Sequence, residues 1–181
     1  MTHSRNSSLA TARRQFVDLW GQMAPHWGIN RTMAQIHALL MISPEPLTAE
    51  QIMEELQISR GNASMNLREL GNWAIVRRTS VAGDRRDFFT TEGDVWVMFY
   101  NIFRERKRRE LDPLLNRLVD CAAAAGSTAE NPDEQAQHKA YTDRMKELAE
   151  FFSAFHNLFG RILEHPPADL AAMAKSMEKM L

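Results

Sequence analysis

Short polar and basic side chains cluster between positions 59 and 86, and their chemistry is hydrogen bonding and ion pairing. Asn62 and Ser64 can exchange hydrogen bonds with base edges, and Arg68 can reach guanine or a phosphate. Small residues such as Gly61 let a backbone come close to a phosphate. These types at this spacing indicate contact with duplex DNA, and the contact residues that we expect are Ser59, Arg60, Gly61, Asn62, Ser64, Met65, Arg68, Arg85 and Arg86.

The net charge of -1 hides an uneven distribution of charge along the chain. Residues 59–109 hold 11 basic and 6 acidic side chains, whereas residues 110–181 hold 7 basic and 12 acidic ones. A basic surface on a nearly neutral protein is typical of a nucleic-acid contact. A solvated helix face with internal salt bridges gives the same count of charges. The predicted helices and strands must therefore decide between a nucleic-acid contact and a solvated face.

The sequence offers little for catalysis, metal binding or membrane insertion. Cys121 is the single cysteine, the 6 histidines form no pair at metal-ligand spacing, and no nucleophile–base set is present. No apolar run approaches the ~18 residues of a membrane span, and residues 1–14 lack the apolar core of an export signal. We therefore expect a cytoplasmic protein that is not an enzyme, with no cofactor, no metal and no membrane partner.

Periodic apolar residues predict helices that would position the polar side chains. Steps of three and four residues indicate helices over about 8–27 and around 33–40. Thr48 and Gln51 form a capping box that opens a third helix, and Ser59 caps a fourth after a very short turn. The fourth helix is predicted over 60–72, with an apolar packing side and a small, polar opposite side.

The rest of the chain predicts a hairpin and more helices. β-Branched segments at 74–81 and 85–91 flank the turn Ala82-Gly83-Asp84, with basic residues on both sides. A long helix is predicted over 93–124, followed by a linker and by helices over about 133–155 and 156–181, the last broken at Pro166-Pro167. The expected fold is mainly α with a small β-hairpin, arranged as a winged helix-turn-helix domain plus further helices.

Three stretches carry a resemblance to a known family: SRGNASMNLREL at 59–70, VRR at 76–78 and GDRRD at 83–87. With them, the chain resembles MarR-type winged-helix transcriptional regulators, and more specifically their GbsR-like branch, over roughly residues 15–120. The resemblance implies a homodimer that reads a palindromic operator in double-stranded DNA, and we expect it to act as a repressor. The family's Asp-x-Arg wing element matches Asp84 and Arg86, which implies that Asp84 braces the wing.

The interpretation as a winged helix-turn-helix regulator predicts three functional segments. We expect an N-terminal dimerisation helix at 1–28, the winged helix-turn-helix DNA-binding domain at 29–92, and a C-terminal helical dimerisation region at 93–181. Alternation along the first hairpin strand lets at most one of Arg77 and Arg78 touch DNA, so neither is included among the contacts. The basic run at 104–109 is interspersed with glutamates, a pattern typical of intrahelical ion pairs.

Four aromatic residues on the long helix are candidates for an effector site: Trp96, Phe99, Tyr100 and Phe103. Aromatic faces can hold a quaternary ammonium compound by cation–π attraction, and the GbsR-like branch includes members tied to choline and glycine betaine. Aromatic residues at helical spacing are also typical of a core or a dimer interface.

Two other functions remain open from the sequence. One is a winged-helix protein–protein interaction module whose basic hairpin serves only solubility. The other is a small-molecule sensor that does not bind DNA directly.

Overall fold

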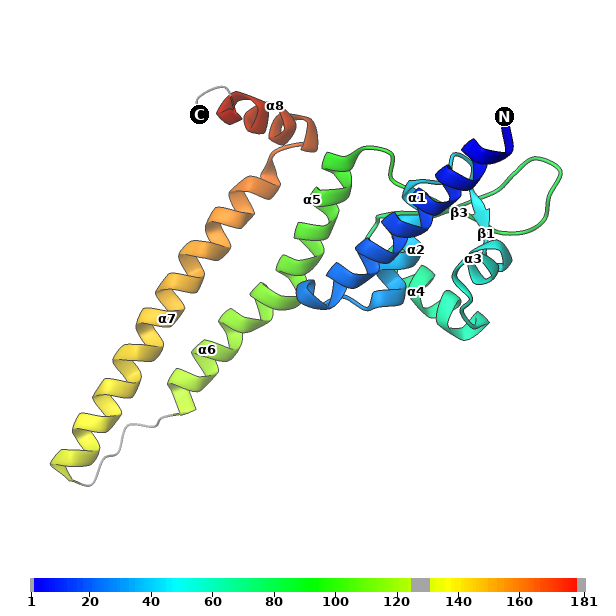
Figure 1. Ribbon diagram of the computed structural model, residues 1–181. Coiled ribbons are helices and arrows are strands. Elements are labelled where there is room, and N and C mark those ends of the chain that lie inside the picture. Colours follow the sequence, from blue (N-terminus) through cyan, green and yellow to red (C-terminus); the bar gives the residue numbers. More distant parts are fainter. Residues whose placement is uncertain (1, 125–130, 179–181) are drawn as a thin grey trace. The chain divides into compact units, whose positions relative to one another are not determined.

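The computed structural model describes residues 2–124 and 131–178. The chain divides into two compact units, Met1–Asn101 and Ile102–Leu181, and the division falls within helix α5, Val95–Arg106 (Figure 1). The described residues are mostly helical, with one small antiparallel sheet, as the sequence predicted. Among them, no helix combines the length and apolar character needed to cross a bilayer.

The first unit begins with two helices that pack against each other. Helix α1, Thr2–Met23, leads into a 3-10 turn, Ala24–Trp27, and helix α2 spans Arg31–Met41. The Asn30 side chain caps α2 by accepting hydrogen bonds from the backbone N–H groups of Thr32 and Met33. The predicted first helix is thus present, with its last turn in the tighter 3-10 form.

Helices α3, Ala49–Leu56, and α4, Arg60–Asn72, form the helix-turn-helix that the caps predicted. The Thr48 hydroxyl accepts from Gln51 N at 3.3 Å, while Thr48 N donates to Gln51 Oε1 at 2.8 Å, which completes the capping box. Gln57 ends α3 in the left-handed region, at φ 53°, and the chain turns directly into α4.

The sheet has three strands in the order β1-β3-β2, all antiparallel neighbours. Strand β2, Val76–Thr79, pairs with β3, Phe88–Thr91, as the predicted hairpin requires. The prediction of strands reaching the Gly83-Asp84 turn was wrong, because residues 80–87 form a longer loop, here called the wing loop. Strand β1, Leu47–Thr48, was not predicted, since two residues are too few to show alternation.

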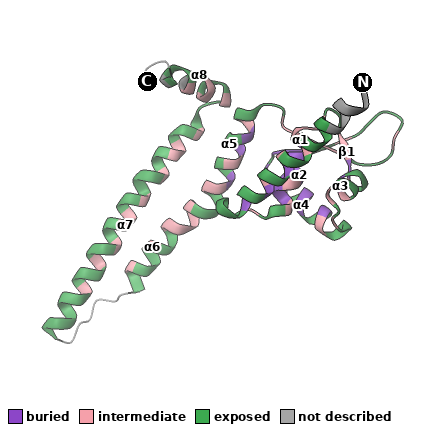
Figure 2. Ribbon diagram, viewed as in Figure 1, coloured by how far each residue is buried: buried purple, intermediate pink, exposed green. Residues whose placement is uncertain are grey.

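The core of the first unit lies among α2, α3, α4 and the sheet, where buried residues concentrate (Figure 2). Its largest fully buried side chains are Ile36, Ile52, Leu70, Met98 and Thr48. The Asn101 side chain donates to Ala74 O at 2.9 Å, which ties the middle of α5 to the turn after α4. The core therefore fixes the orientation of α4 relative to the sheet. Each large apolar side chain buried there stabilises the folded state by about 1.5–3 kcal/mol.

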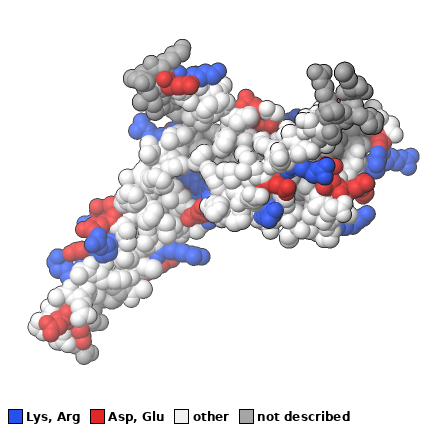
Figure 3. Space-filling view, in the orientation of Figure 1, with Lys and Arg blue, Asp and Glu red and all other residues white. Residues whose placement is uncertain are grey.

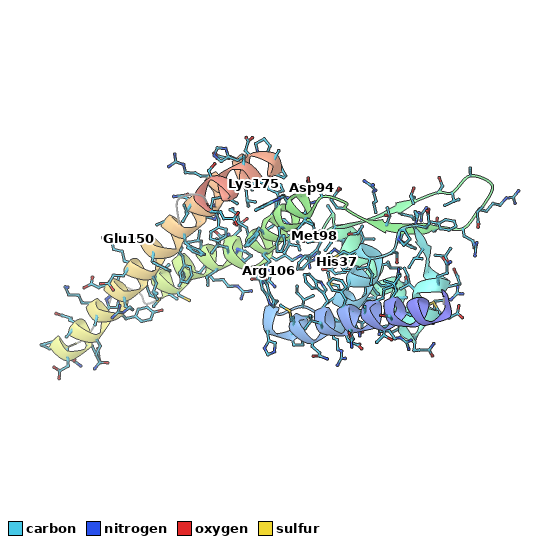
Figure 4. The ribbon with its side chains drawn as sticks, turned by 45° about the horizontal axis from the view of Figure 1, so that its top comes forward. His37, Asp94, Met98, Arg106, Glu150 and Lys175 are labelled. Atoms are coloured by element: carbon cyan, nitrogen blue, oxygen red, sulfur yellow. The ribbon has the colours of Figure 1, made fainter. Side chains whose placement is uncertain are left out.

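One histidine lies within this core. His37 of α2 is 3% exposed, and Figure 4 marks it together with the buried Met98 of α5. Burial lowers the pKa of the His37 imidazole from 6.5 to about 4, because the charged form loses its hydration. At neutral pH this histidine is therefore an uncharged member of the core.

The second unit contains the last turns of α5 and helices α6, α7 and α8. The last turns of α5 continue through a π-helical segment, Lys107–Leu111, into α6, Asp112–Ala124, which packs against α7, Pro132–Glu164 (Figure 1). Helix α8 spans Pro167–Glu178. The predicted break between two helices at 155–156 was wrong, since α7 continues to Glu164 and stops only before the proline pair.

The predicted intrahelical ion pairs are present at the start of this unit. Glu105, which is 7% exposed, accepts hydrogen bonds from the guanidinium groups of Arg108 and Arg109, while Arg106 pairs with Glu110 at 3.5 Å. These bonds, led by that of Arg108, lower the pKa of the Glu105 carboxyl. The basic run is thus largely paired within its own helix.

Candidate nucleic-acid interface

Helix α4 presents one packed face and one exposed face. The Ser59 hydroxyl accepts a hydrogen bond from Asn62 N at 3.3 Å and so caps the helix. Ala63, Leu67 and Leu70 are buried in the core. The opposite side is exposed, as the helical spacing predicted, and carries Arg60, Gly61, Ser64, Met65 and Arg68.

The wing loop is held by a clasp between Asp84 and Arg86. Asp84 accepts hydrogen bonds from the Arg86 backbone N at 2.9 Å, from Nε at 3.0 and 3.1 Å, and from Nη2 at 2.5 Å. Bonding to the Arg86 side chain, followed by the bond to its backbone, lowers the pKa of the Asp84 carboxyl to about 2. The Arg86 guanidinium also lies 5.6 Å from the centre of the Phe88 ring. Asp84 therefore stays ionised and shapes the loop from within.

A cleft of about 700 Å³ separates the exposed side of α4 from the wing. Five arginines line this α4–wing cleft: Arg60 and Arg68 from α4, Arg78 from β2, and Arg85 and Arg86 from the wing loop. Figure 3 shows basic side chains, with carboxylates among them, at the end of this unit that carries the wing and α3. Such a cleft can hold a polyanion, because guanidinium groups pair with phosphate oxygens.

Two carboxylates share the cleft with the arginines. Glu50 of α3 lies 3.7 Å from Arg60, and Asp87 of the wing loop lies 3.1 Å from Arg78. All four side chains are more than half exposed, so each pair contributes little to stability. Over the part of the chain that the structure describes, Arg68 and Arg85 form no ion pair. An arriving anion therefore meets two unpaired arginines and two weakly paired ones.

Sequence reasoning missed Arg78. The residue shares the α4-facing side of strand β2 with Val76, which also lines the cleft, whereas Arg77 pairs with Glu92 at 3.9 Å. The period-two alternation of a strand places residues 76 and 78 on one side, and this signal could have selected Arg78 over its neighbour.

The predicted contact residues fall into two groups. Arg60, Ser64, Arg68, Arg85 and Arg86 line the α4–wing cleft. Ser59, Gly61, Asn62 and Met65 lie at the beginning and on the exposed side of α4 without lining the cleft, and Met65 is 52% exposed. A Cβ atom added at Gly61 would meet no atom within 4 Å, so the surface there is open.

The aromatic effector candidates share one side of α5. Trp96, Phe99 and Phe103 are exposed, at 40%, 37% and 44%, while Tyr100 is half-buried. The Phe103 ring lies 6.2 Å from that of Phe159 on α7. None of these four residues lines the α4–wing cleft. An effector site on α5 stays a prediction. Within residues 2–124 and 131–178, no group of three or more His, Cys, Asp or Glu side chains could hold a metal ion.

Comparisons with known proteins agree with the fold. A family model described as the MarR family matches residues 27–87. The chain is 25% identical over 158 residues to the HTH-type transcriptional repressor GbsR of Bacillus subtilis (strain 168), a match that covers 80% of this chain and 87% of that protein. A solved structure of a transcriptional regulator is similar in fold, with a TM-score of 0.53 and 20% identity over 85% of this chain and 99% of the other. The resemblance found in the sequence is confirmed.

Proposed function

We propose that this chain, a DNA-binding transcriptional regulator of the MarR type and similar to GbsR, acts as a homodimeric repressor at a palindromic operator. The observation that carries the proposal is the α4–wing cleft, in which arginines from three separate elements face one space. A narrow, capped helix with small exposed residues lies on one side of that space. This combination fits a duplex, which offers base edges in a groove and phosphates beside it.

Helix α4 would enter the major groove, which is about 12 Å wide, and bring its first turns to the base edges. Asn62 and Ser64 would then hydrogen-bond to bases, and Arg85 would follow the backbone or the minor groove beside the helix. The phosphates between these contacts would lie along the α4–wing cleft. Phosphate oxygens would there replace Glu50 and Asp87 as partners of Arg60 and Arg78.

Dimer formation is supported by apolar residues that α7 leaves exposed. Phe151, Phe155, Leu158 and Ile162 follow helical spacing and are exposed at 61%, 40%, 55% and 39%. A contiguous apolar stripe of this kind marks an interaction site. A symmetric dimer would set two α4 helices about 34 Å apart, one turn of DNA.

Sedimentation equilibrium tests the dimer. The wild-type chain should sediment at twice its monomer mass, and Phe155→Asp should shift it toward the monomer because a charge enters the apolar stripe. Glu150→Ala, an exposed position on the same helix, serves as the control. A wild-type chain that stays monomeric at micromolar concentration contradicts this part of the proposal.

The effector of the same regulator would be a quaternary ammonium compound held by the aromatic residues of α5. Three of these rings are exposed and so can offer their faces to a cation. Choline should raise the melting temperature of the wild type but not that of Trp96→Leu, whereas Trp27→Leu, also at an exposed tryptophan, should respond like the wild type. An equal response of all three proteins would remove Trp96 from the site.

Selection of bound duplexes from a random pool tests DNA recognition directly. The wild type should enrich a palindrome with half-sites about one helical turn apart. Replacing Arg85 and Arg86 by alanine should weaken binding to every sequence, whereas Asn62→Ala should mainly blur the preference at one base. If these changes leave DNA retention intact and instead abolish binding of a protein partner, the winged helix is an interaction module.

A further inference from the structure

Two asparagines on α4 form a pair one helical turn apart. Asn66 is 3% exposed, an unusual burial for an amide, and Asn62 is half-buried near the start of the helix. The Asn66 Nδ2 group donates to Asn62 O at 2.8 Å and to Asn62 Oδ1 at 2.6 Å. Both N–H bonds of the Asn66 amino group are thus used within the helix.

The chemistry of the contacts determines which way each amide points. A backbone carbonyl only accepts hydrogen bonds, so the Asn66 atom near Asn62 O must be the amino nitrogen. The same nitrogen contacts the Asn62 side chain, so the atom there must be the carbonyl oxygen. The amino group of Asn62 then occupies the other end of its amide, and in the described part of the chain it donates to no protein atom.

We propose that Asn66 is a positioning residue that turns the amino group of Asn62 outward, so that Asn62 reads a hydrogen-bond acceptor on a base edge. The inference rests on the proposed function, since it requires α4 to lie in the major groove. An unrestrained asparagine pairs with adenine through both ends of its amide. With its oxygen turned toward Asn66, Asn62 directs its amino group, a donor, outward.

This donor distinguishes two classes of base. Guanine and thymine offer only hydrogen-bond acceptors in the major groove, cytosine offers only a donor, and adenine offers both, an acceptor at N7 and a donor at N6. An outward amino group on Asn62 therefore favours guanine, thymine or adenine over cytosine at the base that it faces. One hydrogen bond of ordinary strength corresponds to a preference of about fivefold at that position.

The Asn66→Asp variant makes the sharpest test, because it changes one donor into an acceptor of the same shape. A carboxylate at position 66 would attract the Asn62 amino group and turn the Asn62 oxygen toward the groove. Duplex selection with the full chain should then show a reversal at one base, from guanine or thymine to cytosine, while adenine is compatible with both orientations of Asn62. A merely structural role for Asn66 would lower stability without reversing a base preference.

Three further proteins complete the experiment. Asn62→Ala identifies the base in question, and Asn66→Leu, which stays buried without donating, should lose most of the fivefold preference at that same base. Asn72→Ala, at an exposed asparagine near the end of α4, should select the wild-type site. If the Asp variant is unfolded, as its melting curve would show, the Leu variant decides the question by itself.

The outcomes separate this inference from the proposed function. If the wild type enriches no sequence, both the proposed function and the role of Asn66 are contradicted. A wild type that enriches a palindrome, together with an Asn66→Leu variant that retains the preference at the base identified by Asn62→Ala, overturns the role of Asn66 alone. Enrichment of cytosine at that base by the wild type overturns it equally.

Discussion

Replacing Arg85 by alanine should change how strongly DNA binding depends on salt. Arg85 is an exposed arginine of the α4–wing cleft, and in the described residues it has no ion-pair partner. The substitution therefore removes a positive charge without leaving a carboxylate unpaired. Any loss of affinity should arise at the phosphates.

The size of the effect follows from counterion release. Four of the five cleft arginines in each chain are unpaired or weakly paired, whereas Arg86 is bound by Asp84, so a dimer would bring eight to the phosphates and log K against log salt should slope at about -7. Arg85→Ala removes two of them, so the slope should become shallower by about 1.8. At 0.1 M salt this change of slope corresponds to a loss of about 60-fold in affinity relative to the wild type.

Fluorescence anisotropy titrations of one labelled duplex at several salt concentrations measure both quantities. Arg144→Ala is the matched control, because Arg144 is an exposed arginine of α7 that pairs with Glu147 at 2.9 Å. Its slope should equal that of the wild type. If Arg85→Ala also keeps the wild-type slope, or if Arg144→Ala changes it equally, the cleft is not where phosphates bind.

Three further predictions concern the scaffold. Burial lowers the pKa of His37 to about 4, so the unfolded chain binds a proton at this residue more readily than the folded one does. The free energy of unfolding should therefore have its full value above pH 6.5 and fall by about 3 kcal/mol toward pH 4. Urea unfolding should show this fall in the wild type and not in His37→Leu. Ser59→Ala should cost about 1 kcal/mol in urea unfolding through loss of the α4 cap, whereas Ser80→Ala, in the wing loop, should cost less than about 0.5. Glu105→Gln should destabilise by about 2 kcal/mol at pH 7, because the arginine pairs lose a charged acceptor, and the difference from wild type should vanish on acidification through the lowered pKa of Glu105.

The helix-turn-helix was predictable because its signals are local. The Thr48 capping box and the Ser59 cap each depend on residues within three positions, and both form as the sequence indicated. The exposed and packed sides of α4 follow from helical spacing alone. Likewise, the Asp84–Arg86 clasp joins residues two positions apart.

The errors arose where local patterns compete with other contacts. The wing strands end early because the Arg86 N–H bonds to the Asp84 side chain and so is not available to a sheet ladder. No residue at 155–156 breaks a helix, so α7 continues to the proline pair. The π-helical segment at Lys107–Leu111 has no signature in apolar spacing.

Strand alternation could separate Arg78 from Arg77, but the sequence did not show which element each polar side chain meets in space. The position of Arg78 beside α4 depends on how the sheet packs against that helix, and the burial of Asn66 depends on the core around it. Both residues are polar and lie in segments that the sequence placed correctly. Their surroundings, rather than their type, determine what they do.

The clasp in the wing loop also bears on how quickly such a protein searches DNA. Closing a loop of about ten residues takes only tens of nanoseconds, and Asp84 and Arg86 are much nearer than that in the chain. The loop therefore regains its shape far faster than the protein meets a new stretch of duplex. Little conformational freedom remains to be lost at each encounter, so association proceeds at a rate set by diffusion and by electrostatic steering.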